Sequence, residues 1–123
     1  MIFIVSAEGR ISFITPSVTR ISGFTEQEML GKSPTDFIHP EDVELAVSEL
    51  SQVEKSTYQS TPTLYRVKHK DGSYIYTETI GIDMLDNIYV NGIVVFCRNV
   101  TERIKYEKKL FESEAKLKES QRV

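Results

Sequence analysis

Residues 64–80 read LYRVKHKDGSYIYTETI, and this stretch decides the fold. Asp71-Gly72 near its middle is a dipeptide typical of a tight β-hairpin turn. Side chains alternate with a period of two before the turn, and β-branched and aromatic residues are frequent after it, as is typical of strands. We therefore predict a hairpin with strands over 64–69 and 73–80.

A third strand is predicted to follow this hairpin, over Ile88–Val100. Its start is ambiguous because Asp86-Asn87 and Asn91-Gly92 can each form a two-residue turn. We favour a turn at Asp86-Asn87, since it leaves two long strands to pair. Gly92 would then lie inside the third strand, as a bulge or as a point where another segment of backbone approaches closely.

The N-terminal half begins with another hairpin and continues with short helices. Two apolar runs, Ile2–Val5 and Ile11–Ile14, flank a turn in which Gly9 can adopt a positive φ at little cost. Thr25 and Glu28 have the spacing of a capping box, which marks the start of a helix. The helices are expected at Ser17–Ile21, stopped by Gly23, at Thr25–Gly31, and from Val43, after His39-Pro40-Glu41-Asp42, to about Val53.

Residues 101–123 differ from the rest because they contain no glycine or proline and consist mostly of good helix formers. Ile104 and Phe111 stand seven residues apart, and so do Leu110 and Leu117. This apolar stripe is thin, so it would form a weak coiled coil that needs further sequence beyond this chain. We therefore expect a long, exposed helix that belongs to a larger protein.

Six short motifs accompany this order of elements. They are Gly9 in a strand turn, Gly23-Phe24, Glu28-Met29-Leu30-Gly31, His39-Pro40-Glu41-Asp42, Lys70-Asp71-Gly72 and Asn99-Val100-Thr101-Glu102-Arg103. Each motif is weak by itself, but together, over nearly the whole chain, they resemble the Per-Arnt-Sim (PAS) family of sensory domains. Three residues depart from the pattern: Thr15, Tyr76 and Asn99 stand where the family commonly has Asn, Trp and Asp.

The resemblance implies an α+β PAS fold, a five-stranded antiparallel sheet with helices on one face and a C-terminal exit helix. It divides the chain into a sensory domain at 1–100 and a signalling helix at 101–123. In such domains the helices and the sheet enclose a pocket that can hold a small molecule or be closed. If a ligand binds here, we expect the pocket to include Phe24, Met29, Phe37, Leu50, Ile93 and Val95.

The resemblance also implies that the junction between the sheet and the exit helix transmits the signal. We assign this relay to Asn99, Thr101 and Arg103. Because Asn99 replaces the usual Asp, it removes a charge that often pairs with a basic side chain, and we expect a weaker, neutral hydrogen bond there. We expect a homodimer that forms through two exit helices. A small shift of the last strand would then change how these helices pair.

Catalytic and cofactor chemistry finds little support in the residues. His39 precedes a helix and is expected at the surface, and His39, His69 and Cys97 lack the spacing of a metal site. The helix over 43–53 contains no histidine, which argues against an axial haem ligand. A covalent flavin adduct would need a reactive cysteine in the helical half, whereas Cys97 lies in a predicted strand. We assign no catalytic residue and leave the cofactor open.

Charge and hydropathy argue against several classes of function. Residues 1–100 carry 8 basic and 13 acidic side chains, and residues 101–123 carry 7 and 5, a balance that does not favour nucleic-acid binding. No apolar run approaches the roughly 20 residues that cross a bilayer, so we expect no direct membrane contact. The single cysteine fits a reducing compartment, and we expect a cytoplasmic protein.

The resemblance implies a non-enzymatic module for sensing, signal relay and dimerisation in a larger signalling protein. We expect that protein to be a sensor histidine kinase of a two-component system, as many proteins with PAS domains are. Three alternatives stay open. They are a PAS domain of a transcription regulator or a cyclic-dinucleotide enzyme, a structural dimerisation module without ligand, and a small enzyme that uses His39, Glu41 or Asp42. The sequence names neither the signal, the effector nor the dimer geometry.

Overall fold

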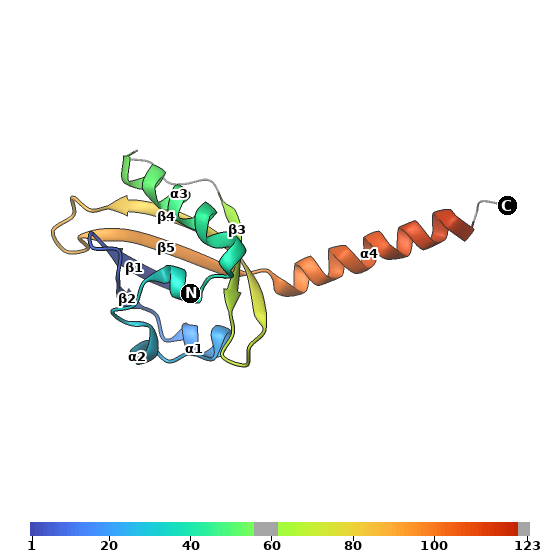
Figure 1. Ribbon diagram of the computed structural model, residues 1–123, viewed down its shortest axis with the longest axis horizontal. Coiled ribbons are helices and arrows are strands. Elements are labelled where there is room, and N and C mark those ends of the chain that lie inside the picture. The colour runs from blue at the N-terminus through green and yellow to red at the C-terminus, as the bar shows by residue number, and fades with distance from the viewer. Residues whose placement is uncertain (56–61, 121–123) are drawn as a thin grey trace.

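The computed structural model describes residues 1–55 and 62–120, and Figure 1 shows its architecture. An antiparallel sheet of five strands has the order β2-β1-β5-β4-β3. The strands are β1 (Ile2–Ser6), β2 (Ile11–Ile14), β3 (Thr63–Lys68), β4 (Tyr74–Met84) and β5 (Gly92–Asn99). Shorter helices cover one face of the sheet and the last helix projects away from it, which confirms the predicted fold class.

The N-terminal hairpin joins the sheet through β1, which pairs with both β2 and β5. Ile4 lies opposite Phe13 on one side and opposite Val94 on the other. Because side chains alternate along a strand, this register directs the neighbouring Val5 and Ile93 to the other face of the sheet. Both are buried there in one apolar cluster, so the core lies on the face that the helices cover.

Short helices connect the two hairpins. They are α1 (Ser17–Ser22), α2 (Glu26–Met29), the 3-10 helices η1 (Pro34–Phe37) and η2 (Pro40–Asp42), and α3 (Val43–Lys55). α1 ends at Gly23, whose φ of 81° is accessible to glycine because it has no Cβ. The predicted capping box is present at α2: Glu28 N donates to Thr25 Oγ1, and Thr25 N donates to Glu28 Oε1.

An ion pair fixes the end of η2, directly before α3, to β3, an edge strand of the sheet. Arg66 Nη2 donates to Asp42 Oδ1 at 2.8 Å, and the backbone N–H of Arg66 donates to Asp42 Oδ2 at 2.8 Å. The side-chain hydrogen bond from Arg66 lowers the pKa of Asp42 and outweighs the opposing effect of burial. The helical layer is therefore attached to the sheet by a charged contact at its edge.

The predicted start of the last strand at Ile88 is wrong, because β5 begins only at Gly92. The side chain of Asn87 accepts hydrogen bonds from the backbone N–H groups of Tyr89 and Val90, so these residues form a turn instead of pairing. Ile88 and Tyr89 are 85% and 90% exposed. β4 is correspondingly longer than predicted, and its last residue pairs with Gly92.

Gly92 is nevertheless a point where another segment of backbone approaches closely, which is one of the two roles that we expected for it. A Cβ added to Gly92 would lie 2.5 Å from Val5 O and 2.7 Å from Ile4 Cγ2. Both atoms belong to β1, so any side chain at this position would push β1 away from β5. The glycine therefore allows the N-terminal hairpin to join the sheet at the start of β5.

The last helix, α4 (Thr101–Ser120), follows β5 after a single residue and extends away from the body of the molecule (Figure 1). The end of the predicted helix, 121–123, lies outside the described residues. Leu110, Phe111 and Leu117 are 49%, 74% and 60% exposed on α4. Among the helices that the structure describes, none is both long enough and apolar enough to cross a membrane.

Candidate functional site

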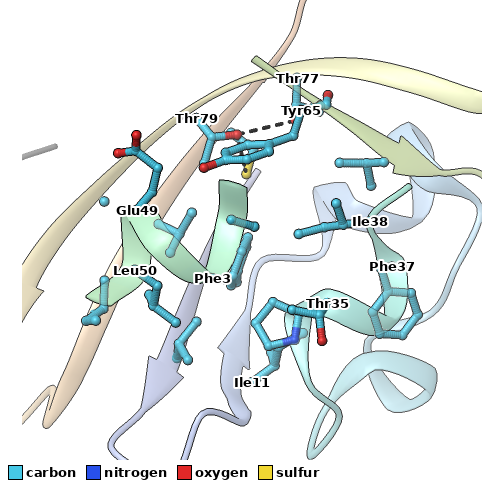
Figure 2. A pocket seen from close by; sticks show the side chains of 18 of the residues that line it. Phe3, Ile11, Thr35, Phe37, Ile38, Glu49, Leu50, Tyr65, Thr77 and Thr79 are labelled. Atoms are coloured by element: carbon cyan, nitrogen blue, oxygen red, sulfur yellow. Dashed lines mark hydrogen bonds between the residues drawn. The ribbon is translucent and has the colours of Figure 1, made fainter. Parts of the chain in front are cut away.

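A cavity of about 310 Å³ lies between the helices and the covered face of the sheet (Figure 2). Most of its wall is apolar. Phe3, Val5 and Ile11 line it from the N-terminal hairpin, and Ala46 and Leu50 line it from α3. Its volume falls at the lower end of the range for small-molecule sites, which begins at roughly 300 Å³. The cavity therefore has the size and the character of a site for a small apolar ligand.

Five of the six predicted pocket residues lie on the wall of this cavity. They are Met29, Phe37, Leu50, Ile93 and Val95. Phe24 is not among the lining residues, contrary to expectation. Its ring packs edge-on against Phe37, with the two ring centroids 5.2 Å apart. The chain turns at the left-handed Gly23 immediately before it, and Phe24 then supports a wall residue without reaching the cavity.

Polar side chains on the sheet side of the cavity form a short row that our sequence analysis missed. Thr77 and Thr79 of β4 and Cys97 of β5 all line the cavity. Thr79 Oγ1 lies 3.3 Å from Thr77 Oγ1 and donates to Cys97 Sγ at 3.8 Å. The period of two in the predicted strand 73–80 already placed both threonines on one face, and this signal could have found them.

Burial raises the pKa of two groups in the cavity wall, Tyr65 and Cys97. It raises the pKa of Tyr65 to about 12, helped by the negative charge of Glu49, and the pKa of the Cys97 thiol to about 11. Both groups therefore stay protonated at neutral pH. Because a protonated, buried thiol is a poor nucleophile, the cavity offers hydrogen-bonding groups rather than reactive ones.

His39 is partly exposed and lies at the start of η2. Its Nδ1 accepts a hydrogen bond from the backbone N–H of Glu41 at 3.1 Å, and its ring centroid lies 4.6 Å from that of Tyr74. This histidine therefore caps a helix start. Within residues 1–55 and 62–120, no three His, Cys, Asp or Glu side chains come together as a metal site would require.

The start of α4 is held by contacts that we call the latch, formed by Tyr76, Glu78, Asn99, Thr101 and Arg103. Thr101 Oγ1 accepts a hydrogen bond from the backbone N–H of Tyr76 at 2.9 Å and donates one to Asn99 Oδ1 at 2.6 Å. Thr101 is buried, and its own N–H donates to Asn99 Oδ1 at 3.0 Å. The three predicted relay residues thus lie together, and the hydrogen bonds of Asn99 are neutral.

A charged contact completes the latch. Arg103 Nη2 donates to Glu78 Oε2 at 3.1 Å, and both side chains are partly exposed. The carboxylate that the exit motif lacks at Asn99 is therefore supplied by β4. Sequence reasoning missed Glu78 and Tyr76 because they lie 25 residues from their partners, and no local pattern links such distant positions.

A family model described as "PAS fold" matches residues 11–87, which is more than half of the chain. The chain belongs to the PAS family. The match begins at β2 and ends in the turn after β4, so it includes α1 to α3 and most of the cavity wall but not α4. This PAS chain is therefore a sensory domain of the type that its motifs predicted.

Curated relatives of this PAS domain are much longer proteins. The aryl hydrocarbon receptor nuclear translocator homolog of Drosophila melanogaster is 33% identical over 93 residues, which is 75% of this chain and 14% of the relative. The White collar 2 protein of Neurospora crassa is 35% identical over 78 residues, or 63% of this chain and 14% of that protein. The chain thus spans about a seventh of the length of these relatives.

Solved structures share the fold. The PAS-B domain of Drosophila melanogaster Cycle with bound ethylene glycol superposes with a TM-score of 0.73 and 27% identity, over 80% of this chain and 97% of that one. A PAS domain from Colwellia psychrerythraea gives a TM-score of 0.72 and 20% identity, over 82% and 86% of the two chains. The second likeness is one of fold alone.

Proposed function

We propose that this PAS domain senses a small molecule in its cavity and relays the occupancy of that cavity to α4. The observation that carries the proposal is the alternation along β4. Thr77 and Thr79 line the cavity, whereas the Glu78 side chain, on the other face of the same strand, and the backbone N–H of Tyr76 contact the start of α4. A displacement of this one strand would therefore change both sites at once.

The latch is suited to a change of state because its contacts are few. The ion pair of Arg103 with Glu78 is partly exposed, and such pairs contribute about 0–1 kcal/mol. A ligand can shift the position of α4 only if it binds one arrangement of the latch more tightly than the other. Thr77, Thr79 and Cys97 would connect a bound ligand to the latch. They line the cavity and belong to β4 and β5, the two paired strands that carry the latch.

We propose that the output is a change in a homodimer formed through α4. Leu110, Phe111 and Leu117 are exposed along this helix. Leu110 and Leu117 stand seven residues apart, as do Ile104 and Phe111, and this spacing fits a partner helix. A helix of this length with a thin apolar stripe is marginal alone, so the pairing would be weak and adjustable. Weak pairing is what a relay requires, because a small change in free energy then alters the population of dimers.

We place this domain in a transcription regulator, in preference to the sensor histidine kinase that we expected from the sequence. The relatives support this choice, since a nuclear translocator homolog, White collar 2 and Cycle are all among them. The cavity favours a ligand sensor over a purely structural module. The capping hydrogen bond of His39 argues against an enzyme that uses this histidine. The cytoplasmic location stays a prediction.

Sedimentation velocity of the 123-residue chain tests this function with naphthalene as an apolar probe. We expect a weak monomer–dimer equilibrium whose dissociation constant changes when naphthalene saturates the cavity. Ala46→Phe is the matched control, because Ala46 lines the cavity and a phenyl group there would occupy about half of it, leaving too little room for the two rings of naphthalene. An unchanged dissociation constant in the presence of bound naphthalene, or a monomer at all concentrations, would contradict the proposal.

A further inference from the structure

We infer that the cavity is built for an uncharged ligand of about two fused rings that carries one hydrogen-bonding group, and that this group binds Thr79. The inference rests on the proposed function, because it names the chemical class of the molecule that the domain would sense. It is argued from the volume of the cavity, from the hydrogen bonds of its polar row and from the charges on its wall.

The volume sets the size of the ligand. A cavity of about 150 Å³ lined by apolar side chains is large enough to bind benzene. The cavity of this domain is about 310 Å³, roughly twice that volume. A two-ring molecule therefore fits, whereas a large cofactor such as a haem or a flavin would need the helices to move apart.

The hydroxyl of Thr79 has room for a stronger hydrogen bond than it makes. Its side-chain partners are Thr77 Oγ1 at 3.3 Å and Cys97 Sγ at 3.8 Å. Hydrogen bonds between hydroxyl groups are usually 2.7–2.8 Å long, and sulfur is a weak acceptor. Thr35, on the opposite wall, is different because its Oγ1 lies 2.8 Å from Ser33 Oγ. Of these two threonines, only Thr79 gains a good partner when a ligand hydroxyl arrives.

The charges on the wall exclude an anionic ligand. Among the described lining residues no side chain is Lys, Arg or His, and Glu49 carries a carboxylate. The terminal ammonium group of Met1, also at the wall, donates to Cys97 O at 3.1 Å, and its charge balances that of Glu49, so the wall has no net positive charge. A ligand carboxylate would lose its hydration and meet Glu49 without a basic side chain to compensate, which is costly in an apolar site. The polar group of the ligand is therefore a neutral hydroxyl or carbonyl.

Binding of three matched probes to the intact 123-residue chain tests this assignment. The probes are naphthalene, 2-naphthol and 2-naphthoate, and the measured quantity is the ratio of the naphthalene to the 2-naphthol dissociation constant. Thr79→Val removes the hydroxyl at nearly constant shape, and we expect it to lower this ratio by about 3- to 10-fold, the effect of one net hydrogen bond. Thr35→Val is the control and should leave the ratio unchanged. The 2-naphthoate anion should bind most weakly.

The outcomes separate this inference from the proposed function. If neither naphthalene nor 2-naphthol binds, the proposed ligand-sensing function is overturned. If both bind and Thr79→Val leaves the ratio unchanged, or if 2-naphthoate binds more tightly than 2-naphthol, this inference alone is overturned. Should Thr79→Val fail to fold, nuclear Overhauser effects in the unaltered protein decide, because the hydroxyl-bearing ring of 2-naphthol should contact the Thr79 methyl group. Contacts of that ring only with Phe37 and Ile11 would contradict the inference.

Discussion

Glu78 Oε2 on β4 accepts a hydrogen bond from Arg103 Nη2 on α4 at 3.1 Å. This contact supplies, from a neighbouring strand, the negative charge that Asn99 does not have at the end of β5. It also connects α4 to the strand whose other face lines the cavity. The relay that we propose depends on this arrangement of the latch.

Glu78→Gln should lower the free energy of unfolding by about 0.2–1 kcal/mol at low salt, because exposed ion pairs are weak. The loss should shrink in 1 M NaCl, where the Debye length falls to about 3 Å. Urea denaturation at both salt concentrations measures it. Glu8→Gln, at an exposed turn residue, is the control. An equal loss in the control, or a loss that salt does not change, would show that the contact has no ionic contribution.

Thr101→Val should cost more, about 1–3 kcal/mol, because it leaves the partly buried N–H of Tyr76 without its acceptor. Thr101→Ser keeps the hydroxyl and should lose much less. The free energies of unfolding of both variants, compared in urea, check this prediction. A loss confined to Thr101→Ser, with Thr101→Val as stable as the unaltered protein, would mean that the threonine methyl group, which valine keeps, stabilises the junction rather than the hydrogen bonds.

Gly92→Ala should destabilise the domain by about 1–3 kcal/mol, because its Cβ would collide with Val5 O and with the side chain of Ile4. Thermal unfolding followed by circular dichroism measures the loss. We expect amide exchange to become faster in β1 and β2, since the N-terminal hairpin joins the sheet at this point. An alanine variant as stable as the original protein would refute the close approach of β1 and β5.

Protonation of Asp42 should lower the free energy of unfolding in acid. Its pKa is lowered in the folded state, so its contribution is fully present above the unfolded pKa of about 3.9 and is lost as the pH falls through the lower folded value. Asp42→Asn should therefore be destabilised at neutral pH and show a weaker decline in stability below pH 4. Asp86→Asn, at an exposed loop residue, should keep the decline. Identical acid profiles for Asp42→Asn and the unaltered protein would contradict this role.

Much of the fold could be predicted because its boundaries are set by local chemistry. Gly23 and the capping box of Thr25 and Glu28 determine helix ends within a few residues, and the alternation around Asp71-Gly72 determines a hairpin. The start of β5 could not be predicted in this way. Two turn signals compete there, and the outcome depends on the side chain of Asn87 capping its own turn.

Local sequence patterns also predicted part of the candidate site. Burial follows from the apolar pattern, so Ile93 and Val95 were found on the cavity wall, whereas the position of Phe24 depends on the turn at Gly23. Thr77 and Thr79 were overlooked because polar residues are rarely assigned to an apolar cavity.

The central claim is that ligand binding in the cavity changes the contacts of the latch. Hydrogen exchange at two backbone amides tests this claim most directly. The N–H of Val100 donates to Tyr76 O at 2.9 Å, and the N–H of Tyr76 donates to Thr101 Oγ1 at 2.9 Å. We predict that saturating naphthalene changes the exchange rates of both amides in the unaltered chain and of neither in Ala46→Phe. Unchanged rates at Val100 and Tyr76, with naphthalene bound and the amides around the cavity responding, would contradict the account.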